Sequence, residues 1–220
     1  MDPASLIDHT ILKPDATADD VRRICAEARA HGFAAVCVNP GRVALVAAEL
    51  AGSDVAVCAV VGFPLGATTT DQKVAETRGC LEAGATEIDM VLNLGLLKDG
   101  DHAAVEADIH QVVLACRDGG ALLKVILETS LLDDDQVVGA CALAVSAGAG
   151  FVKTSTGFAG GGATVHHVAL MVDAVKEAGL GVKASGGIRT REQAESLVRA
   201  GATRLGASAS VAIVGGQEQV

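Results

Sequence analysis

One phrase recurs along the chain: an alanine-rich segment ends on a glycine and passes directly into an apolar run. It occurs as "EAGATEIDM" (82–90), "SAGAGFVKT" (146–154) and "RAGATRLGA" (199–207). Glycine is favoured just past the end of a helix, where the chain turns left-handed. The repeated unit is therefore a helix followed by a strand, with a period of about 20 to 35 residues.

The same alternation extends over the whole chain. The glycines that close the alanine-rich stretches are Gly32, Gly52, Gly84, Gly120, Gly148, Gly179 and Gly201. The apolar runs lie at 6–12, 34–38, 55–61, 87–93, 122–128, 151–155, 181–185 and 203–208. Eight strand–helix units in a chain of this length predict an α/β fold, a (β/α)8 TIM barrel forming a single domain over residues 1–220. A doubly wound open sheet is the alternative.

Composition excludes several classes of function. The formal net charge of −10 argues against nucleic-acid binding, because phosphate backbones attract concentrated Lys and Arg, yet it allows a small anionic ligand. Half of the residues are hydrophobic but only 2% are aromatic, so Ala, Val, Leu and Ile must build the core. The six cysteines form no CxxC pair, which argues against a zinc or thioredoxin-like site.

The start of the chain and its apolar runs predict the compartment. The segment "MDPASLIDHT" lacks the basic and apolar regions of a signal peptide. No apolar run approaches the roughly 20 residues needed to span a bilayer. We therefore expect a soluble cytoplasmic protein with reduced thiols and no membrane partner.

Side chains alternate along a strand, so each apolar run has two faces. In four of these runs one face is apolar; its residues are Ile88, Met90, Val125, Leu127, Val152, Val182 and Ala184. The other face of these runs carries Glu87 and Asp89, Lys124 and Glu128, Lys153 and Ser155, and Lys183 and Ser185. The apolar faces suit packing against helices, so the polar faces are predicted to point into the barrel.

Lysines inside a barrel are costly unless they are paired. One interpretation is a structural network in which Asp89 and Glu128 neutralise the three lysines. However, Lys153 and Lys183 stand at the same point of consecutive strands, near the ends where catalytic residues of these barrels gather. Burial and a neighbouring cation lower a lysine's pKa, and a neutral amine can attack a carbonyl to form an imine. The residues alone leave open which of the two is the nucleophile.

Glycine-rich stretches follow the last three predicted strands, at "STGFAGGGAT" (155–164), "SGGIRT" (185–190) and "LGASAS" (205–210). Each supplies backbone N–H groups at or before a helix start, which suits an anion. Together they predict a phosphate site at the end of the barrel. Arg189 either adds charge to this site or is a solvated residue at a helix start.

Longer segments resemble the signature segments of deoxyribose-phosphate aldolases. They are "IDHTILKPDAT" (7–17), "VCVNP" (36–40), "VGFPLGATTTDQKVAETRGCLEAGATEIDMVLNLG" (61–95), "LKVILET" (123–129), "FVKTSTGF" (151–158) and "VKASGGIR" (182–189). The resemblance runs in order over most of the chain. It implies a class I aldolase that needs no metal or other cofactor and cleaves 2-deoxyribose 5-phosphate to acetaldehyde and glyceraldehyde 3-phosphate.

The resemblance also assigns roles by motif. It makes Lys153 the Schiff-base nucleophile, Lys183 the lysine that lowers its pKa and helps to move protons, and Asp89 the general acid/base, acting through a water. It implies that the phosphate lies at Gly157, Gly186, Gly187, Arg189, Gly206 and Ser208. It further implies that Asp8, Thr10, Cys37 and Lys124 line the pocket in supporting roles.

One departure from the family concerns the proton added to C2. Some members use a tyrosine in a C-terminal tail for this transfer, whereas this chain has no tyrosine and ends "VGGQEQV". Either water with Lys183 and Asp89 suffices, or turnover is weaker.

Two other functions compete with the aldolase. A sugar-phosphate epimerase or isomerase would use Asp89 as its base but leaves the paired lysines unexplained. A non-catalytic phosphosugar-binding module predicts binding without turnover, and the intact set of Lys153, Lys183 and Asp89 argues against it. No metal site is expected, because the adjacent His166 and His167 point to different helix faces. We expect a homo-oligomer, a dimer or tetramer.

Overall fold

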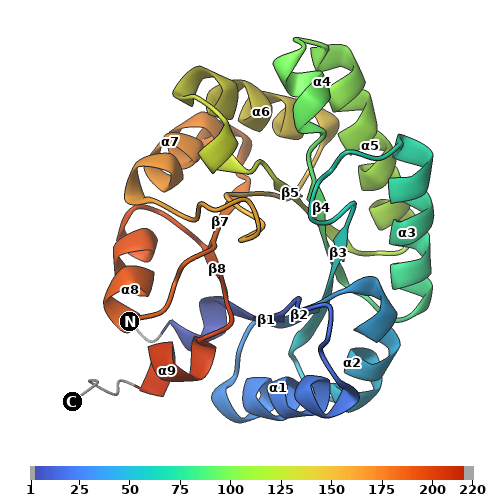
Figure 1. Cartoon of the computed structure of the whole chain (residues 1–220), viewed down its shortest axis with the longest axis vertical. Coiled ribbons are helices and arrows are strands. Elements are labelled where there is room, and N and C mark those ends of the chain that lie inside the picture. The colour runs from blue at the N-terminus through green and yellow to red at the C-terminus, as the bar shows by residue number, and fades with distance from the viewer. Residues whose placement is uncertain (1–2, 216–220) are drawn as a thin grey trace.

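Eight parallel strands close into a barrel at the centre of the molecule, and helices surround it (Figure 1). The computed structural model of the chain describes residues 3–215. The strands are β1 (Ile7–Ile11), β2 (Ala35–Val38), β3 (Ala56–Val61), β4 (Glu87–Val91), β5 (Leu122–Ile126), β6 (Phe151–Lys153), β7 (Gly181–Ser185) and β8 (Arg204–Ala207). Each strand pairs with the next in the chain, and β8 returns to β1. The expected (β/α)8 barrel is therefore confirmed, and the open sheet is excluded.

Helices follow the strands on the outside of the barrel. They are α1 (Ala18–His31), α2 (Val43–Glu49), α3 (Thr70–Glu82), α4 (Leu94–Lys98), α5 (His102–Asp118), α6 (Asp134–Ala147), α7 (Val165–Val175), α8 (Arg191–Arg199) and α9 (Ser210–Gly215). Helices α1, α6 and α8 begin with capping boxes at Thr17, Asp133 and Thr190, whose side chains accept a backbone N–H that the helix leaves unpaired. All seven glycines predicted to end a helix have positive φ, as expected.

The two faces of the strands separate as predicted. The apolar side chains of β4 to β7 are buried in the main core, which lies between the barrel and the helices. Inside the barrel a small apolar cluster forms from Ala35, Cys37, Cys58 and Val60, and charged side chains fill much of the remaining interior. Among residues 3–215 no helix is long and apolar enough to cross a membrane. All six cysteines are buried and unpaired.

Strand pairing decides which charged residues meet. Lys153 of β6 lies opposite Lys183 of β7 in the register, and Asp89 of β4 lies opposite Lys124 of β5. Because inward side chains from neighbouring strands form layers inside such a barrel, this register brings the polar faces of four consecutive strands together.

Gly66, in the loop between β3 and α3, offers a test of how tightly this barrel end is packed. Its φ is +68°, and a Cβ there would lie 2.0 Å from the carbonyl oxygen of Leu92. Gly52 also has positive φ, +74°, but a Cβ there would meet no atom within 4 Å. We expect Gly52→Ala to lower the free energy of unfolding by about 1 kcal/mol, and Gly66→Ala to lower it by a further ~1–3 kcal/mol through overpacking.

Urea denaturation of the two variants measures this difference. Equal losses of unfolding free energy in both variants would show that the backbone around Leu92 shifts to accommodate the added methyl group.

Candidate active site

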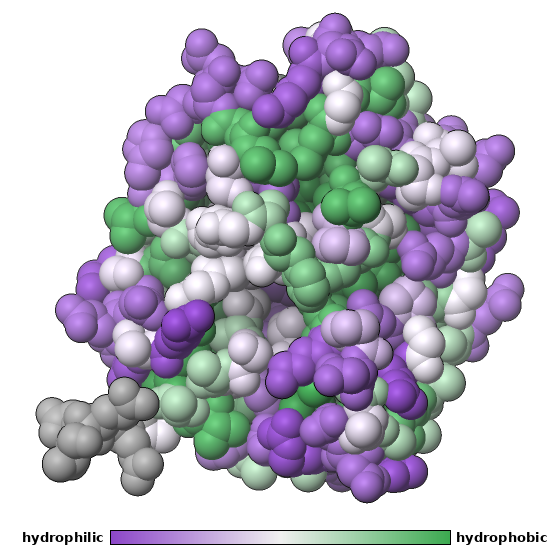
Figure 2. Space-filling model, in the orientation of Figure 1, coloured by the Kyte–Doolittle hydropathy of each residue, from purple (hydrophilic) through white to green (hydrophobic). Residues whose placement is uncertain are grey.

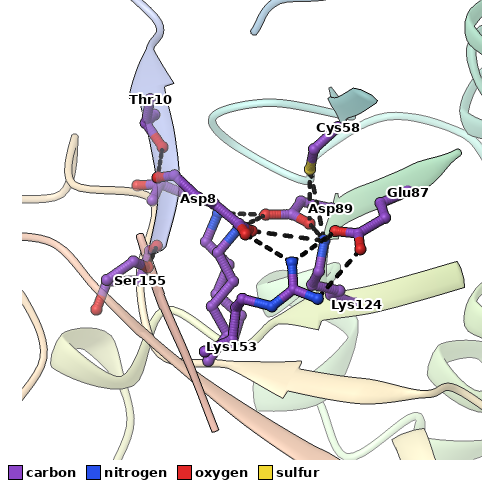
Figure 3. Close-up of polar contacts among 12 residues, drawn as sticks. Asp8, Thr10, Cys58, Glu87, Asp89, Lys124, Lys153 and Ser155 are labelled. Atoms are coloured by element: carbon purple, nitrogen blue, oxygen red, sulfur yellow. Dashed lines mark hydrogen bonds and ion pairs between the residues drawn. The ribbon is translucent and has the colours of Figure 1, made fainter. Parts of the chain in front are cut away.

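Asp89 is the centre of a buried cluster of charges inside the barrel (Figure 3). Its Oδ1 lies 2.8 Å from the Lys124 Nζ, and its Oδ2 lies 2.7 Å from the Nζ atoms of both Lys153 and Lys183. The lysines come from three successive strands and converge on one carboxylate. The structural network hypothesis expected Asp89 to neutralise the three lysines, and these distances match that expectation.

Two further carboxylates complete the cluster. Asp8 of β1 binds Lys183 and lies 2.7 Å from the Arg204 Nη1, while Glu87 of β4 lies 2.6 Å from the Lys124 Nζ and 3.1 Å from the Arg204 Nη1. Sequence reasoning missed Arg204. The alternation of β8 carries the signal, because Arg204 stands two residues before Gly206, whose side of the strand lines the site.

Glu128 does not neutralise the lysines, and that prediction is wrong. Strand β5 ends at Ile126, and Glu128 then adopts a left-handed conformation with φ 55°. This turn takes its carboxylate out of the inward-facing row of β5. It accepts hydrogen bonds from Thr156 instead.

The cluster shifts the pKa values of its members in opposite directions. Burial alone would raise the pKa of Asp89, but the ammonium groups of Lys124, Lys153 and Lys183 outweigh it and hold that pKa well below the usual range. Burial lowers the pKa of Lys183, but Asp8 and Asp89 outweigh it and raise that pKa above its usual value. Lys183 is therefore a cation at neutral pH, which favours the tuning role over the nucleophile role that its sequence also allowed.

A cavity of about 290 Å³ opens above the cluster at the C-terminal ends of the strands, and Figure 2 shows a hollow near the centre of this face. Of the three strand lysines, Lys153 lines it and the other two do not. The predicted residues that line it are Thr10, Gly157, Gly186, Gly187, Arg189, Gly206 and Ser208. The lining residues that were not predicted for the site, all inside the quoted segments, are Ile11, Leu12, Lys13, Thr156, Phe158, Ser185, Ile188 and Ala207.

The structure corrects one prediction: the cavity is not lined by Asp8, Cys37 and Lys124. All three are fully buried and absent from the cavity wall. Asp8 and Lys124 belong to the charge cluster, and Cys37 lies beside Cys58 in the strand register. They stand too deep in the barrel to reach the cavity, so any part they have in the site is through the residues they contact.

The glycine-rich loops after β6 and β7 pack against each other at the cavity wall. The Ala163 N–H donates to the Gly186 carbonyl oxygen at 3.1 Å, and a Cβ on Gly162 would lie 2.3 Å from that same oxygen. Only glycine allows the two loops to approach this closely. Helices α7 and α8 begin directly after these loops, so the positive ends of their dipoles lie on this side of the barrel.

Among residues 3–215, three groups of side chains have spacing that suits a metal ion. Two of them contain Asp8 or Asp89, whose oxygens already contact ammonium groups. The third consists of Asp134, His166 and His167 on the surface. The prediction that the two histidines point apart is wrong in its geometry, because their ring centroids are 5.4 Å apart at the start of α7.

The low pKa of Asp89 has a consequence for stability. The ionised carboxylate stabilises the fold above its ordinary pKa of 3.8, and this stabilisation is lost as the pH falls through the lower folded pKa. We expect Asp89→Asn to lower the free energy of unfolding by about 3 to 5 kcal/mol near pH 7, as for a broken buried pair. The gap from the wild type should narrow below about pH 4.

Urea denaturation from pH 7 to pH 2 measures this gap. Asp173→Asn, at an exposed pair with Lys176, is the matched control and should track the wild type throughout. A gap for Asp89→Asn that stays constant with pH would contradict the assignment.

Comparison with known proteins places this site in a family. A family model described as DeoC/LacD family aldolase matches residues 4–215. The chain is 59% identical over 214 residues to a deoxyribose-phosphate aldolase of Bacillus mycoides, covering 97% of this chain and 95% of that protein. A similar relative from Bacillus cytotoxicus is also 59% identical over 214 residues, with the same coverage.

Solved structures agree with these relatives. A tetrameric structure of deoxyribose phosphate aldolase from Aeropyrum pernix superposes with a TM-score of 0.91 at 38% identity, covering 96% of this chain and 89% of that one. An aldolase called QR15 superposes with a TM-score of 0.93 at 37% identity, covering 98% and 95%. The sequence match over nearly the full length and the shared barrel lead to one conclusion: this chain belongs to the DeoC/LacD family of aldolases.

Proposed function

We propose that this chain is a class I aldolase that reversibly cleaves 2-deoxyribose 5-phosphate to acetaldehyde and glyceraldehyde 3-phosphate. The observation that carries the proposal is the position of Lys153, which contacts the buried carboxylate of Asp89 and also lines the cavity. The relatives that share 59% identity with the chain are named for this activity.

Ion pairing supports Lys153 as the nucleophile. Lys124 has three carboxylate partners and Lys183 has two, whereas Lys153 has one. A neutral amine at Lys153 therefore gives up a single ion pair, and a substrate in the cavity can reach it. Lys183 supplies the nearby positive charge, and Asp89 holds the two lysines side by side.

The reaction then proceeds in balanced steps. The Lys153 amine adds to C1 of the open sugar, and uptake of one proton with loss of water gives a protonated imine. A water beside Asp89 takes the C3 hydroxyl proton and passes a proton to the Asp89 carboxylate. The C3–O bond becomes the aldehyde carbonyl, the C2–C3 bond breaks, and its electron pair moves into the imine to form an enamine. Glyceraldehyde 3-phosphate leaves. Protonation of the enamine at C2 and hydrolysis release acetaldehyde and restore the amine.

The C2 proton reaches the enamine without a tyrosine, because the chain has none. The end of the segment "VGGQEQV", residues 216–220, lies outside the described residues. Lys183, protonated and 2.7 Å from Asp89, is the proposed source of the proton, relayed through a water.

The loops after β6, β7 and β8 are proposed to bind the phosphate. Gly186 and Gly187 line the cavity without side chains, so their backbone can approach an anion closely, and Arg189 lines the same cavity. The cluster below holds the imine-forming lysine. The epimerase and binding-module hypotheses leave this lysine without a role.

The cellular setting is also a proposal. Six unpaired, buried cysteines suit the reducing cytoplasm. Assembly of several copies, a dimer or a tetramer, is supported by the tetrameric relative from Aeropyrum pernix.

Borohydride reduction in the presence of acetaldehyde tests the nucleophile. We expect a two-carbon adduct on Lys153, because its amine forms the imine that borohydride reduces, and peptide mass mapping locates it. Lys153→Met should abolish the adduct, whereas Lys176→Met, at an exposed lysine, should leave it intact. An adduct on Lys183 would reverse the roles. No adduct on a folded protein that still binds deoxyribose 5-phosphate would exclude the Schiff-base mechanism.

Substitution of Arg189 tests the phosphate site. We expect Arg189→Ala to raise KM for deoxyribose 5-phosphate about 5- to 10-fold, with a smaller change in kcat. This loss is below that of a buried charge-assisted contact, because Arg189 is exposed to solvent. Arg191→Ala is the matched control, because Arg191 pairs with Glu195 and does not line the cavity. Steady-state kinetics separate the two, and equal KM values for both variants would remove Arg189 from the site.

A further inference from the structure

Glu128 is a buried acidic residue to which the reaction steps above give no role. Only 2% of it is exposed, and none of the ion pairs among the described residues includes it. It is the one residue other than glycine with positive φ in the described part of the chain. Such backbone strain persists where the surroundings hold a residue in place, and it gathers at functional sites.

The surroundings that hold Glu128 are the backbone and side chain of Thr156. The Glu128 Oε2 accepts the Thr156 N–H at 3.2 Å and also the Thr156 hydroxyl. The other oxygen, Oε1, is buried and has no hydrogen-bond partner within residues 3–215. The contact with Thr156 is therefore the polar interaction that Glu128 makes through its carboxylate.

Thr156 stands at the wall of the catalytic cavity. It lines that cavity together with Lys153, three residues earlier in the chain. Its Oγ1 also accepts the Phe158 N–H at 3.0 Å. The loop that follows β6 is thus pinned to the end of β5 through a single hydroxyl group.

The Thr156 hydroxyl has one hydrogen-bonding position left for a group in the cavity. A threonine hydroxyl has one donor and two acceptor lone pairs. The Thr156 hydroxyl donates its proton to the Glu128 Oε2, and its oxygen accepts the Phe158 N–H with one lone pair. One lone pair is left, so Thr156 can bind a group in the cavity only by accepting a hydrogen bond.

We propose that Glu128 is a positioning residue: it fixes the Thr156 hydroxyl as an acceptor for a hydroxyl group of the sugar substrate. This inference rests on the proposed aldolase function. The open form of deoxyribose 5-phosphate carries hydroxyls on C3 and C4, whereas acetaldehyde has none. Glu128 therefore favours hydroxylated substrates over simple aldehydes without taking part in imine formation.

Two readouts on one set of variants separate positioning from a structural role. Cleavage of deoxyribose 5-phosphate requires recognition of a hydroxyl, and borohydride trapping of acetaldehyde on Lys153 does not. We expect Glu128→Ala to lower kcat/KM for cleavage about 10-fold, the effect of one hydrogen bond in a buried site, and to leave the trapping rate within about twofold. Glu128→Gln keeps an acceptor oxygen for Thr156 and should recover most of the loss.

Thr156 variants complete the experiment. Thr156→Val removes the hydroxyl and should reproduce the loss seen for Glu128→Ala, and Thr156→Ser should retain activity. In the double variant Glu128→Ala/Thr156→Val the loss should be no greater than in either single variant, because both remove the same contact.

Three results would overturn the proposal. Equal loss of cleavage and trapping in the soluble, folded Glu128→Gln protein would assign Glu128 a purely structural role. Unchanged cleavage in Glu128→Ala would give it no role, and additive losses in the double variant would make Glu128 and Thr156 independent. Failure of the aldolase function itself is distinguishable, because the wild type would then show neither cleavage nor trapping.

Discussion

The pairing of Asp89 with three buried lysines inside the barrel is the interaction on which the site depends. A buried ion without a partner costs several kcal/mol, so Lys124, Lys153 and Lys183 require a carboxylate within reach. A closed parallel barrel supplies one, because its inward side chains meet in layers at the centre. The cluster is therefore a condition for this barrel to fold as well as the place proposed for its chemistry.

The same pairing separates the lysines by depth. Lys183 lies below the cavity between two carboxylates, which raise its pKa and keep it charged. Lys153 has one carboxylate and reaches the cavity wall. Similar side chains on neighbouring strands thus acquire different environments, one suited to a fixed cation and the other to a nucleophile.

Much of the fold was predictable because its signals are local. The eight strands, the glycines at the helix ends and the inward polar faces all follow from residues near one another in the chain. Two errors in the predicted site have different causes. Glu128 was placed on the inward face by alternation, but the backbone leaves the strand at Ile126. Asp8 and Cys37 were placed at the cavity wall, although motifs carry no information on depth.

By itself, the sequence determined the strand and helix order, the face of each strand and the set of loops that surround the site, since periodicity and turn preferences act between chain neighbours. The tertiary structure alone decided which side chains contact one another inside the barrel. Arg204 donates a hydrogen bond to Asp8, 196 positions away in the sequence. The Glu128 carboxylate accepts a hydrogen bond from Thr156 rather than from a lysine. Such contacts depend on register across strands and on depth in the closed barrel, which no local pattern records.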